Sequence, residues 1–171
     1  MYRYLPKTYL KAAVFDLDGV LFDVSERLKK CLKETGIKNL KNAPKAKKNK
    51  FWKIFLSPKY MYLDKPNTRL IKHIKELKSN NVKIIIVTGR RKDTQGEYTI
   101  KQLKEAEVDY DKIYFRPPNY YMKDFVFKSE ILKKLLRKGY EIIEVWDDNV
   151  EVIDRIKEFL PYANVIHYKI S

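Results

Sequence analysis

Short apolar segments that alternate with stretches of helical periodicity constrain the fold of this chain more than any other feature. The apolar segments are residues 12–15, 82–87, 112–115, 141–146 and 164–168. Each has the length of a strand, and the intervening stretches repeat apolar residues at helical spacing, as at Leu70, Ile74 and Leu77. This alternation predicts an α/β fold with a Rossmann-like, doubly wound and mostly parallel five-stranded sheet, joined by right-handed crossovers.

Polar residues directly follow three of the apolar segments. They are Asp16 and Asp18 after the first segment, Thr88, Gly89 and Arg90 after the second, and Asp147 and Asp148 after the fourth. In an open parallel sheet, ligands bind outside the carboxyl ends of the strands. We therefore expect these side chains to share one site.

The carboxylates of that site would repel one another strongly. A close pair costs about 4 kcal/mol at 4 Å with an effective dielectric constant near 20. A bound divalent cation removes the conflict, and an all-oxygen set of ligands favours Mg²⁺ or Ca²⁺ over Zn²⁺. We expect Mg²⁺ on Asp16, Asp18, Asp147 and Asp148, because Mg²⁺ also works with substrate phosphates. Taken singly, each acid could instead cap a helix or form a turn.

These residues resemble the motifs of the haloacid dehalogenase superfamily of phosphohydrolases. The motifs are the run from Asp16 to Leu21, then Thr88-Gly89-Arg90, a lysine at the start of a later helix, and the Asp147-Asp148 pair. Lys128 is the candidate for the lysine, and Lys123, in the preceding loop, is its rival. The resemblance covers almost the whole chain and implies a phosphatase with the same sheet.

The resemblance also implies a role for each motif residue. Asp16 would be the nucleophile that forms an aspartyl-phosphate, and it would also bind the metal. Asp18 would be the general acid and then the base, and its backbone carbonyl would bind the metal. Thr88 would hold the phosphoryl oxygens, and Lys128 would neutralise the nucleophile and the phosphate. The aspartate pair after the fourth strand would complete the Mg²⁺ site.

A closer resemblance is to the phosphatase domain of polynucleotide kinase-phosphatases. It rests on Arg27 after the first motif, on the aromatic segment 51–55 ahead of 64–66, and on the segment 115–117 ahead of 124–128. It implies a 3′-phosphatase acting in nucleic acid repair, with Arg27, Gly89 and Arg90 near the substrate. Asn149 departs from that group, which usually has arginine after the aspartate pair. No Gly-x-x-x-x-Gly-Lys segment is present, so we expect no kinase activity in this sequence.

The positive charge is concentrated after the first motif. The formal net charge is +15, and the interval between Glu34 and Asp64 contains no acidic residue. Its lysines are Lys38, Lys41, Lys45, Lys47, Lys48, Lys50, Lys53 and Lys59. Lysines among aromatic residues are typical of a groove for single-stranded nucleic acid. We expect a cap insertion at about residues 36–64, irregular as far as Lys50, with Lys47, Lys48 and Trp52 on the substrate. The alternative is a solvated lysine-rich loop.

The remaining features of the sequence limit the class of protein to which the chain can belong. The length of 171 residues fits one phosphatase domain. The single cysteine, Cys31, suits a reducing cytoplasm, and Met1–Lys7 lacks the apolar core of a signal peptide. No segment is long and apolar enough to predict a membrane span. The oligomeric state is not predicted.

Three functions therefore compete. The first is a polynucleotide 3′-phosphatase acting on a DNA or RNA end. The second is a small-molecule phosphatase such as a nucleotidase, whose activity would depend little on salt. The third is a nucleic-acid-binding protein with an inactive site, which the intact motif residues disfavour.

Overall fold

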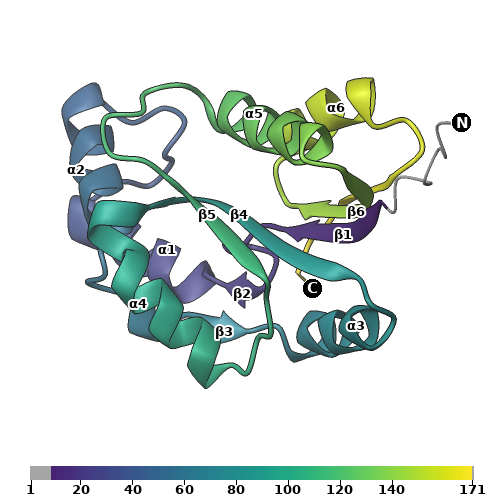
Figure 1. The fold of residues 1–171 in the computed structure, drawn as a ribbon. Helices are drawn as coiled ribbons and strands as arrows, with labels where there is room; N and C mark the ends of the chain where they lie inside the picture. Colours follow the sequence, from purple (N-terminus) through teal and green to yellow (C-terminus); the bar gives the residue numbers. More distant parts are fainter. Residues whose placement is uncertain (1–8, 171) are drawn as a thin grey trace, which may run out of the picture.

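The computed structural model describes residues 9–170, and a five-stranded parallel sheet forms its centre (Figure 1). The strand order is β5-β4-β1-β6-β7. The strands are β1 (Leu10–Phe15), β4 (Lys83–Arg91), β5 (Lys112–Arg116), β6 (Tyr140–Asp147) and β7 (Asn164–His167). All four pairings within this sheet are parallel, which confirms the predicted fold class.

Helices cover both faces of the sheet (Figure 1). On one face, α3 (Thr68–Ser79) and α4 (Lys92–Glu105) pack with the loop after β1 against Ala13 and Phe15. On the other face, α5 (Asp124–Arg137) and α6 (Val150–Phe159) pack against Ala12 and Val14. Alternate residues of β1 thus enter opposite cores, because successive side chains of a strand point to opposite faces.

The insertion between the first and second motifs differs from its prediction. Residues 45–50 were expected to be irregular, but they form the first half of α2 (Lys45–Phe55). Pro44, with φ of −58°, precedes the first turn, and Lys and Ala are good helix formers. Phe51 and Phe55 bury one side of the helix in a small separate core with Cys31. The expectation of a loop was wrong because no large apolar residue marks the helical period of α2 before Phe51.

Short elements connect this insertion to the sheet. Helix α1 (Ser25–Thr35) packs against α2, and η1 (Met61–Leu63) follows α2. Strands β2 (Phe22–Asp23) and β3 (Lys65–Pro66) pair antiparallel and form a separate two-stranded sheet. The insertion therefore leaves and re-enters the fold at adjacent points beside the loop after β1.

Capping residues fix several helix ends. Gly36 ends α1 in the left-handed conformation, and the side chain of Asn67 accepts a hydrogen bond from the Leu70 amide at the start of α3. Asn149 caps α6 in the same way. Helix α5 begins at Asp124, so Lys128, which was expected at the start of a helix, lies one turn inside it.

Within residues 9–170, no helix is long and apolar enough to cross a membrane. The segment Met1–Lys7, which lacks the apolar core of a signal peptide, lies outside the described residues.

Gly19 places the loop after β1 directly against the end of β6. Its φ is +77°, and a Cβ at this position would collide with the carboxylate of Asp148. The Gly19 amide also donates a hydrogen bond to the carbonyl of Phe22, which closes the turn. Only glycine permits both the positive φ and the close approach.

We predict that Gly19→Ala destabilises the protein more than Gly36→Ala. Gly36 also has a positive φ, but the nearest atom to a Cβ there is the Lys47 Nζ at 3.8 Å. Gly36→Ala should therefore cost only the left-handed backbone penalty, roughly 1–2 kcal/mol. Gly19→Ala should add the cost of displacing Asp148. Urea unfolding of both variants measures the difference, and equal losses would contradict the close approach.

Candidate active site

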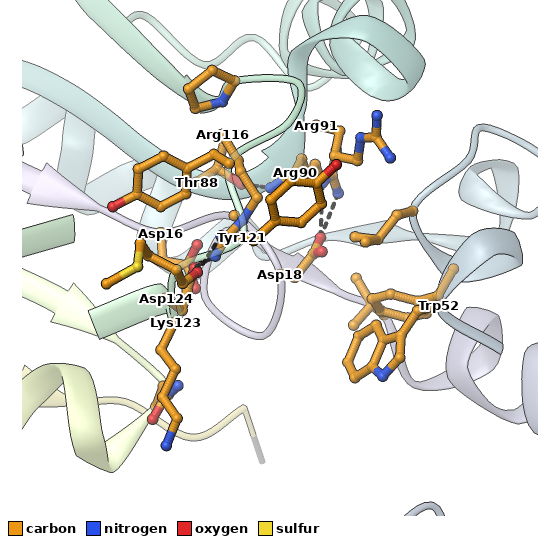
Figure 2. Close-up of a pocket in the computed structure, with 18 of the residues that line it drawn as sticks. Asp16, Asp18, Trp52, Thr88, Arg90, Arg91, Arg116, Tyr121, Lys123 and Asp124 are labelled. Carbon is orange, nitrogen blue, oxygen red and sulfur yellow. Dashed lines mark hydrogen bonds and ion pairs between the residues drawn. The ribbon is translucent and has the colours of Figure 1, made fainter. Parts of the chain in front are cut away.

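The carboxyl edge of the sheet brings together acids that lie far apart in the sequence. Asp16 follows β1, Asp147 ends β6, and Asp148 comes next. One carboxylate oxygen from each of the three lies within 4.8 Å of the others. Asp16 and Asp148 line a cavity of about 1140 Å³ that also receives Asp18 and Thr88. Figure 2 shows Asp16, Asp18 and Thr88 around this cavity.

Lys128 holds the acids together. Its ammonium is 3.2 Å from Asp16 Oδ2, 2.7 Å from Asp147 Oδ2 and 3.1 Å from Asp124 Oδ2. Burial opposes the charge, but these carboxylates outweigh it and raise the pKa of Lys128 well above its usual range. Lys123, the rival candidate, is exposed, and its Nζ lies 5.8 Å from the centre of the Phe125 ring. Lys128 is thus the lysine in contact with the carboxylates.

The acids carry more negative charge than Lys128 balances. Burial raises the pKa of Asp16 well above its usual value; Lys128 opposes the shift, and Asp147 and Asp148 add to it. Loss of hydration and the adjacent Asp147 likewise raise the pKa of Asp148 to about 6. An uncompensated cluster of carboxylate oxygens is the donor set that a hard divalent cation fits. Asp16, Asp147 and Asp148 could therefore hold such an ion.

Asp18 is held by two arginines. Its Oδ1 accepts from Arg27 Nη2 at 2.7 Å and from Arg90 Nε at 2.9 Å. Burial raises the pKa of Asp18, but the two guanidinium groups outweigh it and lower the pKa below its usual value. The carboxylate therefore has a fixed orientation at the edge of the cavity (Figure 2).

The same arginines contact Asp64, a residue that the sequence patterns did not single out as functional. Arg27 Nε lies 3.0 Å from Asp64 Oδ1, and Arg90 Nη2 lies 3.1 Å from Asp64 Oδ2. The remaining guanidinium nitrogens also have protein partners: Arg27 Nη1 donates to the carbonyl of Phe55, and Arg90 Nη1 to the side chain of Gln102. Both arginines were predicted to contact substrate, and in the structure they face these protein groups, although Arg27 Nε and Asp64 Oδ1 make no hydrogen bond and Arg90 also lines the cavity. Their placement favours a role in positioning Asp18.

Asp124 is a second acid that was not predicted to have a role. It lies one turn before Lys128 on α5, and its Oδ1 accepts from Arg116 Nη2 at 2.8 Å (Figure 2). The spacing of four residues on a helix is a signal that could have identified it. A Cβ at Gly89 would lie 2.7 Å from Asp124 Oδ1, so Gly89 allows this close packing.

The insertion contributes Trp52 to the cavity but not the two lysines predicted beside it. Trp52 and Asn49 line the cavity from α2. Lys47 and Lys48 are not among the lining residues, and their ammonium groups reach the carbonyls of Gly36 and Lys41 at 3.5 and 2.9 Å. The rotational orientation of α2 about its axis thus points these lysines toward the rest of the insertion and away from the cavity.

Several solved structures share this fold. Two chains from structures of the Pnkp1/Rnl/Hen1 complex, the second described as an RNA repair complex, are 22% and 23% identical, with TM-scores of 0.70 and 0.69. They cover 94% and 98% of this chain, which spans only 46% and 45% of theirs. A β-phosphoglucomutase-like protein from Thermotoga maritima is 15% identical, with a TM-score of 0.60, and the alignment covers 94% of this chain and 88% of that one. At these identities the likeness shows the fold alone.

A family model gives the sequence-level assignment. No curated protein matches the chain. The model of the polynucleotide kinase PNKP phosphatase domain, however, matches residues 55–161, which is more than half of the chain. The matched range contains Thr88, Lys128, Asp147 and Asp148, and Asp16 precedes it at the same edge of the sheet. The chain is therefore a phosphatase of the haloacid dehalogenase superfamily and belongs to the PNKP phosphatase domain family.

Proposed function

We propose that this chain is a Mg²⁺-dependent phosphomonoesterase that acts through an aspartyl-phosphate on the 3′-phosphate of a nucleic-acid end. One observation carries the proposal: the Asp16 carboxylate borders the cavity beside Asp148, and the buried Lys128 and Asp147 lie next to it. A carboxylate so placed can attack phosphorus, and the charges around it suit a phosphoryl group.

In the first step, a carboxylate oxygen of Asp16 attacks phosphorus and the ester oxygen leaves. The backbone amide of Leu17 donates to Asp16 Oδ1 at 2.8 Å, and Lys128 lies beside Oδ2, so the carboxylate is oriented before substrate arrives. The buried hydroxyl of Thr88 lines the cavity and can donate to a phosphoryl oxygen. Mg²⁺ held by Asp16, Asp147, Asp148 and the Asp18 carbonyl would neutralise charge on the phosphoryl oxygens.

Asp18 moves the protons in this proposal. It gives a proton to the leaving oxygen in the first step and takes one from the attacking water in the second. Arg27 and Arg90 hold one oxygen of its carboxylate and favour the charged form, which suits the second step. The negative charge of an incoming phosphate favours the protonated form that the first step requires.

The nucleic-acid substrate is supported by family membership and by charge. The matched family is that of a polynucleotide kinase phosphatase domain, and the net charge of +15 attracts a polyanion. We also propose that residues 36–64 act as a cap on a single phosphatase domain, since α2 within them lines the cavity. The open cavity would also admit a nucleotide, so a small-molecule phosphatase is the competing function.

Substitution of the two motif aspartates tests the chemistry. Asp16→Asn should abolish turnover, because an amide does not form the acyl phosphate. Asp18→Asn should lower kcat by on the order of 10²–10⁴ through lost acid–base catalysis. Steady-state kinetics on a 3′-phosphorylated oligonucleotide measures both effects. An active Asp16→Asn protein would refute the covalent route.

Metal removal tests the proposed Mg²⁺ site. Treatment with EDTA should abolish turnover, and added Mg²⁺ should restore it. Mg²⁺ should also raise the melting temperature, because an ion that binds the folded state stabilises it. Asp147→Asn should weaken that thermal shift. A melting temperature that does not respond to Mg²⁺ would count against a metal on these carboxylates.

A substrate panel tests the preference for polymers. We expect oligonucleotides with a 3′-phosphate to have a higher kcat/KM than those with a 5′-phosphate and than mononucleotides. The kcat/KM for oligonucleotides should fall steeply with salt, because neutralised phosphates release counterions, whereas turnover of mononucleotides should change little. Equal or better turnover of mononucleotides would favour the nucleotidase.

A further inference from the structure

Two exposed aromatic side chains line the cavity from separate segments of the chain. Trp52 lies on α2, and Tyr121 lies in the loop between β5 and α5. The exposed fractions are 45% for Trp52 and 89% for Tyr121, which is high for aromatic side chains. In the view of Figure 2, Asp18 lies between Asp16 and Trp52, so Trp52 is on the side away from Asp16. The cavity is therefore lined by charged side chains near Asp16 and by the aromatic side chains of Trp52 and Tyr121.

Trp52 packs against two neighbouring aromatic rings of α2. Its ring meets Phe51 edge-on with centroids 5.1 Å apart and meets Phe55 edge-on at 5.8 Å. Phe51 is fully buried and Phe55 nearly so, and they anchor the tryptophan to the small core of the insertion. Part of the indole remains exposed toward the cavity, and a ring fixed in advance loses little entropy when a ligand stacks on it.

Tyr121 sits in a loop that is tied to the catalytic lysine. Arg116 Nη1 donates to the carbonyl of Met122 at 2.7 Å, and Arg116 Nη2 donates to Asp124 Oδ1 at 2.8 Å. The other oxygen of Asp124 lies 3.1 Å from Lys128 Nζ. The hydroxyl of Tyr121 donates to Asn119 Oδ1 at 3.3 Å. The loop that carries Tyr121 is thus linked to the site where phosphate would bind.

We propose that Trp52 and Tyr121 clamp the terminal nucleobase of the substrate, on the sugar whose phosphate lies against Asp16. This inference rests on the proposed function and adds the element that recognises the end. An aromatic ring stacks on the flat face of any base, so the clamp selects for the presence of a base rather than for its identity. Neither aromatic ring carries a charged group. The clamp therefore adds affinity for the base without competing with the site for the phosphate.

The test compares two oligonucleotides that differ only at the 3′ end. Both carry a 3′-phosphate, and one has a normal terminal nucleotide while the other has an abasic sugar. The quantity measured is the ratio of the two kcat/KM values. For the unmodified protein we expect the normal end to be favoured by about 5- to 160-fold, the range that one stacked base contributes. Trp52→Ala and Tyr121→Ala should each move the ratio toward one, and Trp52→Phe should retain most of it.

A matched control is Tyr162→Ala. Tyr162 is 84% exposed, like Tyr121, but it does not line the cavity. This variant should keep the ratio of the unmodified protein. Circular dichroism and the melting temperature check that each variant is folded.

Tryptophan fluorescence provides a second measurement. The chain has two tryptophans, and Trp146 stacks on Phe15 in the core. In the Asp16→Asn background, the normal oligonucleotide should quench the emission more than the abasic one. Trp52→Phe should remove that difference.

The outcomes separate the clamp from the proposed function. A ratio near one in the unmodified protein, or a ratio that neither alanine variant changes, overturns the clamp alone. If neither oligonucleotide is hydrolysed while a small phosphate ester is, the polynucleotide proposal fails and the clamp fails with it. A ratio that falls in both alanine variants and persists in Tyr162→Ala supports the clamp.

Discussion

The buried ammonium of Lys128 is the interaction on which the site depends. A lysine removed from water and left without partners would lose its proton, because desolvation lowers the pKa of a lysine. Here the carboxylates of Asp16, Asp147 and Asp124 keep it charged. The dependence is mutual, since the same acids would repel one another without it. One cation thereby fixes the ends of β1 and β6 relative to the first turns of α5.

A second cluster of ions lies on the other side of the loop after β1. Arg27 and Arg90 hold Asp18 and Asp64, and they come from α1 and from the end of β4. Burying such pairs costs much of the energy that their attraction returns, so they contribute little net stability. Their value here is geometric. Asp64 lies where the insertion returns to the fold, so this cluster ties Asp18 to the insertion as well as to the sheet.

The sequence could predict which side chains share one edge of the sheet, because the order of the strands dictates that position. Parallel strands that end at Asp16, Thr88 and Asp147 must place these three residues at the same edge of the sheet. This holds for any conformation of the connecting loops. Asp64 was missed because an isolated acid between strands has no periodic signal, and its role depends on which cation the fold brings beside it. Asp124 was missed although its spacing of four residues from Lys128 on a helix was a usable signal. Helix α2 was predicted only in part, since its first half is lysine-rich. The direction of Lys47 and Lys48 depends on the rotational phase of that helix, which its packing on α1 sets.

The two ends of the cavity are built on different kinds of structure. The end of the cavity at Asp16 is built on strand termini and a buried lysine, where small displacements would disturb several ion pairs at once. The opposite end is built on an inserted helix and a loop, where substitutions disturb less of the core. Arg116 and Asp124 connect the two, because one carboxylate binds both the loop arginine and Lys128. Under the proposed function, variation in the insertion or the loop would therefore alter which ends are recognised while the phosphoryl chemistry stays on the sheet.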